Sequence, residues 1–326
     1  MTQPLNYTIK AIEDLRALRD KGTWSPHDRM GIDFIISKLI KAEVFVLPDL
    51  GQLLDRTKPR PEVAGEVYRP PHPIVALEYQ SAVPGWTPTS EYDAAPSSRR
   101  IALAWDWDGV FPGPASAKEQ HDVGEGVFVA SISYYDNLGI WVPTGAALMM
   151  GYEAEYRVPD PSAYRDSMVA SGRVSRKTAQ APTLVIRDMM TLLPDSMMQQ
   201  IKKTGEQAAV QAFAADVMDE ANAYSDLCLA LACNNVSTTR NGQPDRLNRA
   251  RIKAGKIPLK DFHVLKIAGG GDGGDAGQPL GSGGVRSHLR RGHVRRLSAD
   301  RITWVNATMV RGSRPGFADK LYQINS

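Results

Sequence analysis

A Pro-free segment rich in Ala, Met, Leu, Gln and Glu runs from Ser196 to Cys233. These residue types favour helix, and the absence of Pro removes the strongest interruption of one. Apolar residues recur here at intervals of three or four: Phe213, Val217, Ala221, Tyr224, Cys228 and Leu231. The segment therefore predicts one long helix with an apolar stripe, which needs another layer of secondary structure to cover it.

Two shorter helices are predicted near the amino terminus. The first covers residues 8–21, where apolar residues recur at intervals of three and charges lie between them. Ser25 and Pro26 open the second, because Ser is a favoured helix cap and Pro is favoured at the first helical position. We expect the two helices to form a hairpin or to cover one face of a sheet.

Strand patterns dominate between residues 100 and 156. Short runs rich in β-branched and aromatic residues predict strands at 74–79, 101–105, 126–135, 138–142, 148–158 and 262–267, a hairpin from 285–297 and 301–310, and an edge strand at 317–324. Residues 182–193 are predicted to open the helical region. The expected fold class is α+β: an antiparallel sheet packed by the long helix, with a basic C-terminal β-hairpin portion.

Charge divides the chain unevenly. Residues 240–314 contain 16 Lys and Arg against 5 Asp and Glu, a local net charge of +11, whereas residues 1–239 have a net charge of −8. We therefore divide the chain into a neutral-to-acidic body, 1–239, and a basic C-terminal region, 240–326, with a Gly-rich mobile loop expected at 269–284. A basic end of this kind predicts an anionic partner.

The densest group of basic residues is His288-Leu289-Arg290-Arg291-Gly292-His293-Val294-Arg295-Arg296. Arginine binds phosphate in a planar, bidentate way, and a neighbouring imidazole can hydrogen-bond phosphate or transfer a proton near neutral pH. A bulge at Gly292 would bring the two histidines to one side of a strand. We predict RNA binding by this stretch and a preceding basic segment, with these contact residues: His288, Arg290, Arg291, His293, Arg295, Arg296, Arg249, Arg251 and Lys253.

Other functions stay open for the same residues. A ribonuclease using His288 and His293, or an inhibitor that binds a host effector protein, would also explain a basic surface with two imidazoles. We expect a protein that is not an enzyme and has no cofactor. No metal site is predicted, because no recognised ligand spacing is present and the local positive charge disfavours a divalent cation. Trp304 and Tyr322 are interpreted as core aromatics rather than stacking platforms for bases.

An apolar strand ending in Asp106-Trp107-Asp108-Gly109 resembles the first motif of haloacid dehalogenase-like phosphotransferases. That resemblance would make Asp106 a nucleophile and Asp108 an acid/base, with Mg²⁺ on their oxygens. The following Phe-Pro-Gly-Pro and further antiparallel strand patterns do not suit that fold. A turn at the end of a strand is the preferred interpretation.

The two cysteines, Cys228 and Cys233, lie in the predicted long helix and are expected to be reduced core residues. The amino terminus shows neither the basic nor the apolar part of a secretory signal, and no apolar run is long enough to span a bilayer. The expected location is the cytoplasm, with no membrane partner.

The C-terminal residues resemble a known group of proteins. The stretch 287–293, the strand Arg301-Ile302-Thr303-Trp304-Val305 and Phe-Ala-Asp-Lys at 317–320 are similar to a group of phage and prophage proteins that includes a type V anti-CRISPR protein. The resemblance implies a phage-encoded regulator that acts on the message of a CRISPR effector during translation in the host cytoplasm. RNA or a ribosome-associated complex would be engaged through His288, Arg290, Arg291 and His293. Here Val294-Arg295 follows the second histidine, so an aromatic stacking residue is missing at that point.

Overall fold

The protein was analysed as a computed structural model, which describes residues 4–21, 24–56, 63, 65–81, 97–112, 124–152, 156–157, 163–170, 176–180, 183–267, 286–290, 293–298, 301–305, 308–310 and 314–317. The helices are α1 (Tyr7–Lys21), α2 (Pro26–Lys41), α3 (Ala163–Ala170), α4 (Arg176–Ala179), α5 (Pro194–Thr204), α6 (Glu206–Leu231) and α7 (Asp245–Lys253), with short 3₁₀ turns η1 (Asp49–Gly51) and η2 (Gly65–Tyr68). The strands are β1 (Glu43–Val46), β2 (Ile74–Gln80), β3 (Ser97–Asp106), β4 (Gly126–Tyr135), β5 (Ile140–Gly151), β6 (Tyr156–Arg157), β7 (Thr183–Leu184), β8 (Asp188–Thr191), β9 (Val236–Asn241), β10 (Phe262–Ile267), β11 (Arg286–Arg290), β12 (His293–Ser298), β13 (Arg301–Val305), β14 (Thr308–Val310) and β15 (Arg314–Phe317).

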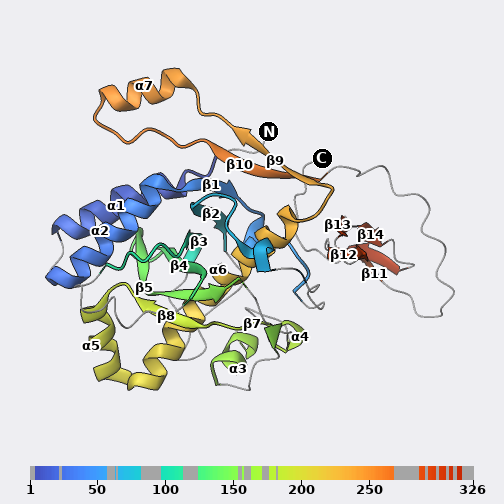
Figure 1. The fold of residues 1–326 in the computed structure, drawn as a ribbon, viewed down its shortest axis with the longest axis horizontal. Coiled ribbons are helices and arrows are strands. Elements are labelled where there is room, and N and C mark those ends of the chain that lie inside the picture. Colours follow the sequence, from blue (N-terminus) through green and yellow to red (C-terminus); the bar gives the residue numbers. More distant parts are fainter. Residues whose placement is uncertain are drawn as a thin grey trace.

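An eight-stranded sheet in the order β8-β5-β4-β3-β2-β1-β10-β9 forms the middle layer (Figure 1). Its neighbours pair antiparallel except at β1, which runs parallel to both β2 and β10. Helices α1 and α2 cover one face, and α6 crosses the other face over β3, β4 and β5. The α+β class and the long helix packed on a mostly antiparallel sheet are therefore confirmed.

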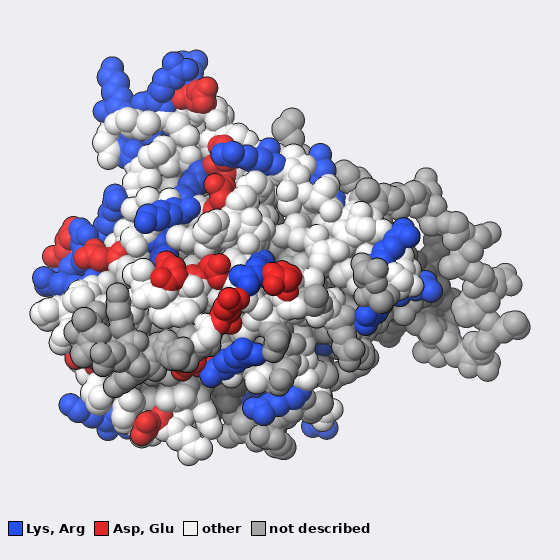
Figure 2. Space-filling view, in the orientation of Figure 1, with Lys and Arg blue, Asp and Glu red and all other residues white. Residues whose placement is uncertain are grey.

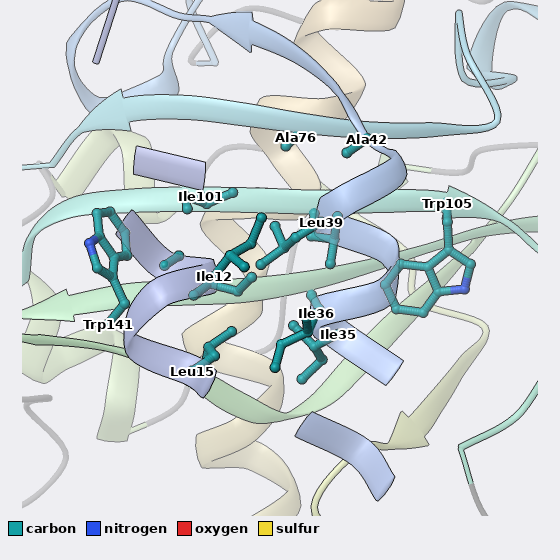
Figure 3. Close-up of a cluster of buried hydrophobic side chains, with 14 of the residues drawn as sticks. Ile12, Leu15, Ile35, Ile36, Leu39, Ala42, Ala76, Ile101, Trp105 and Trp141 are labelled. Carbon is teal, nitrogen blue, oxygen red and sulfur yellow. The ribbon is translucent and has the colours of Figure 1, made fainter. Parts of the chain in front are cut away.

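The first core lies between the helix pair and the sheet (Figure 3). Ile12 of α1 and Leu39 of α2 are fully buried and point toward Ile101 and Trp105 of β3. The apolar spacing of the two helices places these side chains on the sheet side, while most charged residues of the helices remain outside. The prediction that the two helices cover one sheet face is confirmed.

The second core lies under α6. Strand β3 sends Ile101, Leu103 and Trp105 to the first core and Ala102 and Ala104 to the second, as a strand buried on both faces must. The small alanines give α6 room to approach the sheet closely. Of the stripe predicted for this helix, Ala221, Tyr224 and Cys228 are buried in the second core, and Leu227, which was not predicted, lies there with them.

A buried ion pair joins α6 to the sheet. Arg100 of β3 donates from Nε to Glu220 Oε1 of α6 at 2.5 Å, and its Nη2 donates to Ser131 Oγ at 2.9 Å. The Tyr79 hydroxyl donates to the same Glu220 oxygen at 2.8 Å, and Arg100 also contacts Asp216 Oδ1 at 3.1 Å. Because Arg100 and Glu220 are almost fully buried, neither charge is stabilised by solvent and each depends on the other.

Two helices begin on carboxylates from distant parts of the chain. Asp28 of α2 accepts from the backbone nitrogens of Asp195 and Ser196 at 3.0 and 3.1 Å, which satisfies free donors at the start of α5. Glu78 of β2 accepts from Thr8 N at 2.7 Å at the start of α1. In contrast, α2 is capped locally, as predicted: the Ser25 side chain accepts from Asp28 N, and Pro26 opens the helix.

Two sequence expectations for the helical region are wrong. The segment Ser196–Cys233 is not one helix, because Gly205 separates α5 from α6 with φ +87°, a conformation that glycine tolerates and other residues resist. Residues 182–193 do not begin a helix. Part of this segment instead forms β8, where pairing with β5 through Met190 and Ala147 outweighs the helix propensity of methionine.

Most predicted strands are confirmed. The two predicted for 138–142 and 148–158 are one continuous strand, β5, up to Gly151, with an irregular register against β4. Strands β1 and β9 were not predicted. The boundary drawn between residues 239 and 240 falls inside β9, which pairs with β10 in the large sheet. The proposed mobile loop, 269–284, lies outside the described residues.

We expect Glu220 to make the stability of the protein pH-dependent. Burial raises the pKa of its carboxyl from 4.5 to about 7; Arg100 opposes this shift, and Asp219 and Asp216 add to it. A raised folded-state pKa contributes stability below pH 4.5 that is lost as pH rises through 7. The free energy of unfolding of wild type relative to Glu220→Gln should therefore fall as pH rises over this range.

Urea unfolding followed by circular dichroism at several pH values measures this difference. Glu206→Gln, at an exposed position in the first turn of the same helix, is the matched control. A wild-type advantage that grows with pH would contradict the assignment, because it would mean that folding favours the ionised carboxylate of Glu220.

Candidate nucleic-acid interface

The described residues of the predicted RNA-binding stretch lie in strands β11 and β12. His288 and Arg290 lie in β11, which pairs with β14 and β15, whereas His293, Arg295 and Arg296 lie in β12, which pairs with β13. Arg291 and Gly292 lie outside the described residues. The register of the β11–β14 pair, with His288 opposite Val310, continues in the β12–β13 pair, with His293 opposite Val305, in agreement with the predicted hairpin of 285–297 with 301–310.

The β12–β13 hairpin has an inner and an outer face. Val294 pairs with Trp304, and Arg295 pairs with Thr303, so the two pairs point to opposite sides. Trp304 and Ile302 are buried and join the second core beside Val294. Trp304 is thus a core aromatic, as predicted; Tyr322 lies outside the described residues.

An asparagine after the end of α6 holds the hairpin in place. The Asn235 side chain donates to Trp304 O at 2.9 Å and accepts from Trp304 N at 2.8 Å. The Asn235 amide thereby satisfies the backbone N–H and C=O of Trp304, which would otherwise need a neighbouring strand as partner. Asn234 N adds a bond to Ile302 O at 3.2 Å. The hairpin is therefore fixed to the body by both apolar and polar contacts.

The basic side chains of the hairpin remain in solvent. Arg295, Arg296 and Arg301 are exposed, while His293 at the start of β12 is half-buried. Within the part of the chain that the structure describes, no carboxylate pairs with Arg295 or Arg301. Figure 2 shows basic side chains over this hairpin and, separately, over α7. Arg295 and Arg301 can therefore contact an anion without first breaking an ion pair with a described residue.

The other predicted contact residues lie on α7, in the connection between β9 and β10. Arg249 and Lys253 are exposed there. Arg251 faces inward: its Nε donates to Ile257 O at 2.8 Å, and its Nη2 lies 3.3 Å from Glu13 Oε1. Of these three residues, Arg251 already has intramolecular partners, and the other two point into solvent.

Asp106 ends β3 and Asp108 lies in the turn that follows, in agreement with the preferred interpretation. Asp108 accepts from Val110 N at 3.0 Å and pairs with Lys38 Nζ at 2.9 Å, and the Tyr152 hydroxyl donates to Asp106. The surrounding strands are antiparallel rather than doubly wound. These contacts leave Asp106 and Asp108 as parts of the structural framework.

Other candidate chemistry is equally limited. Cys228 and Cys233 are buried free thiols, and burial raises the pKa of each to about 12, so neither is a thiolate at neutral pH. Among the described residues, no cluster of three His, Cys, Asp or Glu side chains could hold a metal ion. None of the described helices has the length and apolar character needed to cross a membrane.

Sequence reasoning missed two contributors to the interface. Arg301 adds an exposed cation at the start of β13, opposite Ser298. Asn235 is the second, because no short-range pattern in the sequence relates it to Trp304. The alternation of Ile302 and Trp304 with polar neighbours was the available sign that β13 docks on a core.

Comparisons with known proteins found little similarity. No protein-family model and no curated protein matches the chain. The crystal structure of AcrVA2, an anti-CRISPR protein, is similar over 93% of this chain and 94% of that chain, with 12% sequence identity and a TM-score of 0.30. AcrVA2 is a weak structural neighbour, and a TM-score of this size carries no argument for a common fold or function.

We expect Asn235→Ala to release the hairpin without unfolding the body. The variant leaves the N–H and C=O of Trp304 without the Asn235 partner, at a cost of about 1–3 kcal/mol. Hydrogen exchange should rise in peptides from 301–305 and stay unchanged in peptides from β3 and β4. Asn222→Ala is the control, since the Asn222 amide donates only within α6, to Met218 O at 2.9 Å. Equal protection of 301–305 in both variants would contradict this role of Asn235.

Proposed function

We propose that this protein is an anti-CRISPR-like regulator of phage origin that binds RNA, free or in a ribosome-associated complex, through its C-terminal strands. Arg295, Arg296 and Arg301 of the β12–β13 hairpin would contact phosphates, with His293 beside them. His288, Arg290 and Arg291 belong to the same proposed interface. The target message, or a host protein bound to it, would be recognised elsewhere on the molecule.

The observation that carries the proposal is the two-sided hairpin. Its inner face is packed on the body through Ile302 and Trp304, and its outer side and ends present arginines. The two hydrogen bonds from Asn235 to Trp304 hold the hairpin in a defined position, so its arginines are presented in a fixed arrangement. Arginine also recognises phosphate more specifically than lysine, because its planar guanidinium donates two parallel hydrogen bonds. The resemblance of the motif to the phage protein group adds the anti-CRISPR-like character.

A cellular crosslinking experiment tests RNA binding. Ultraviolet-crosslinked RNA should be recovered with the wild-type protein and should fall at least about tenfold in Arg295→Glu/Arg296→Glu, since each arginine contact contributes on the order of 1–3 kcal/mol. Arg16→Glu/Arg29→Glu changes the net charge equally at exposed positions on α1 and α2 and should retain the RNA.

Other outcomes would replace the proposal. Equal recovery of RNA from wild type and Arg295→Glu/Arg296→Glu would exclude the hairpin as the contact surface. A bound host protein that survives RNase treatment, with no crosslinked RNA, would identify an inhibitor acting through protein contact. RNA cleavage lost in His293→Ala, with the fold retained, would identify a ribonuclease.

A further inference from the structure

Helix α7 lies outside the three layers of the fold. It projects beyond the β9 and β10 end of the sheet (Figure 1), and none of its residues is buried. Leu247 and Ile252 are 45% and 59% exposed. A helix of nine residues that buries no side chain gains almost nothing from the hydrophobic effect, so its stability must come from other contacts.

Polar bonds to the returning chain hold α7 in place. Asn248 donates from its amide to Leu259 O at 3.0 Å and accepts from Leu259 N at 2.7 Å. Arg251 bonds Ile257 O and Glu13, and Lys260 donates to the Ile40 carbonyl at 2.8 Å. The arm formed by residues 242–261 is therefore a defined structure that contributes no side chain of α7 to either core.

Three basic side chains dominate the outward face of α7, with Asp245 and Ala250 at its edges. At 3.6 residues per turn, Arg246, Arg249 and Lys253 fall within about 60° of one another around the helix axis, opposite Asn248 and Arg251. All three are exposed, and none pairs with a carboxylate of the described residues. Their spacing distributes three positive charges over about 10 Å of helix. Figure 2 shows several basic side chains, with acidic atoms beside them, at the top of the molecule where α7 lies.

We propose that α7 is a second polyanion-binding element, which contacts the phosphate backbone of RNA without reading its sequence. The proposal deepens the RNA-binding function and rests on it. A protein partner would suit this face less well, because interface cores are rich in aromatic residues and poor in lysine, and Leu247 and Ile252 lie off the basic stripe. Three cations on a projecting helix match the sequence-independent, counterion-releasing contacts of nucleic-acid binders.

The test measures RNA affinity against salt concentration. Anisotropy of two short fluorescent single-stranded RNAs of unrelated sequence is recorded between about 50 and 200 mM KCl. Arg246→Gln/Arg249→Gln/Lys253→Gln should lower the affinity for both RNAs to the same extent. It should also reduce the slope of log affinity against log salt concentration by about 2, since each lost phosphate contact contributes about 0.7. Arg16→Gln/Lys21→Gln/Arg29→Gln removes the same charge from α1 and α2 and should keep the wild-type slope.

The outcomes separate this proposal from the hairpin function. A wild-type slope in the α7 variant, with RNA lost in Arg295→Glu/Arg296→Glu, would overturn the role of α7 and leave the hairpin function intact. A reduced salt slope in the α7 variant, with unchanged RNA binding by the hairpin variant, would support the role of α7 and exclude the hairpin as an RNA-binding surface. An equal reduction in the α1 and α2 control would overturn the proposal, because net charge alone would then explain it.

Discussion

The Arg100–Glu220 pair is the contact on which the arrangement of layers depends. One guanidinium in β3 meets a carboxylate from the middle of α6, with Tyr79 and Ser131 completing the shell. Apolar packing alone would let α6 slide or rotate over the small alanines of the sheet, since hydrophobic contact has no direction. The buried charges do have a direction, and leaving either one alone would be costly. The position of α6 then determines where its C-terminal end, and Asn235 after it, meet β13.

The two basic elements are attached in the same way. Asn235 pairs with both backbone groups of Trp304, and Asn248 pairs with both backbone groups of Leu259. In each case a side-chain amide substitutes for a strand neighbour; the hairpin also buries Ile302 and Trp304, whereas α7 buries no side chain. This leaves most residues of each element free to carry charge. Both proposed RNA contacts therefore lie on elements added to the sheet rather than on the core layers.

The sequence predicted the elements whose signals are local. The interval of three in residues 8–21 and the Ser25-Pro26 pair each act within one or two helical turns, and both predictions were confirmed. Gly205 is a local sign of the break between α5 and α6, but the helix-forming residues on both sides of it favour a continuous helix. The strand β8 had none, because Met189 and Met190 favour a helix until β5 offers backbone partners.

By itself, the sequence determined the α+β class, the amphipathic helices, the reduced cysteines and the basic character of the C-terminal third. Only the tertiary structure decided which basic residues are available: Arg251 is held by Ile257 and Glu13, whereas Arg249 and Arg295 are exposed. It also decided that the starts of α1 and α5 are capped by Glu78 and Asp28. The physical reason is distance along the chain. Propensity, capping and periodicity act between residues a few positions apart, but these partners are separated by 70 and 167 positions and meet only when the layers pack.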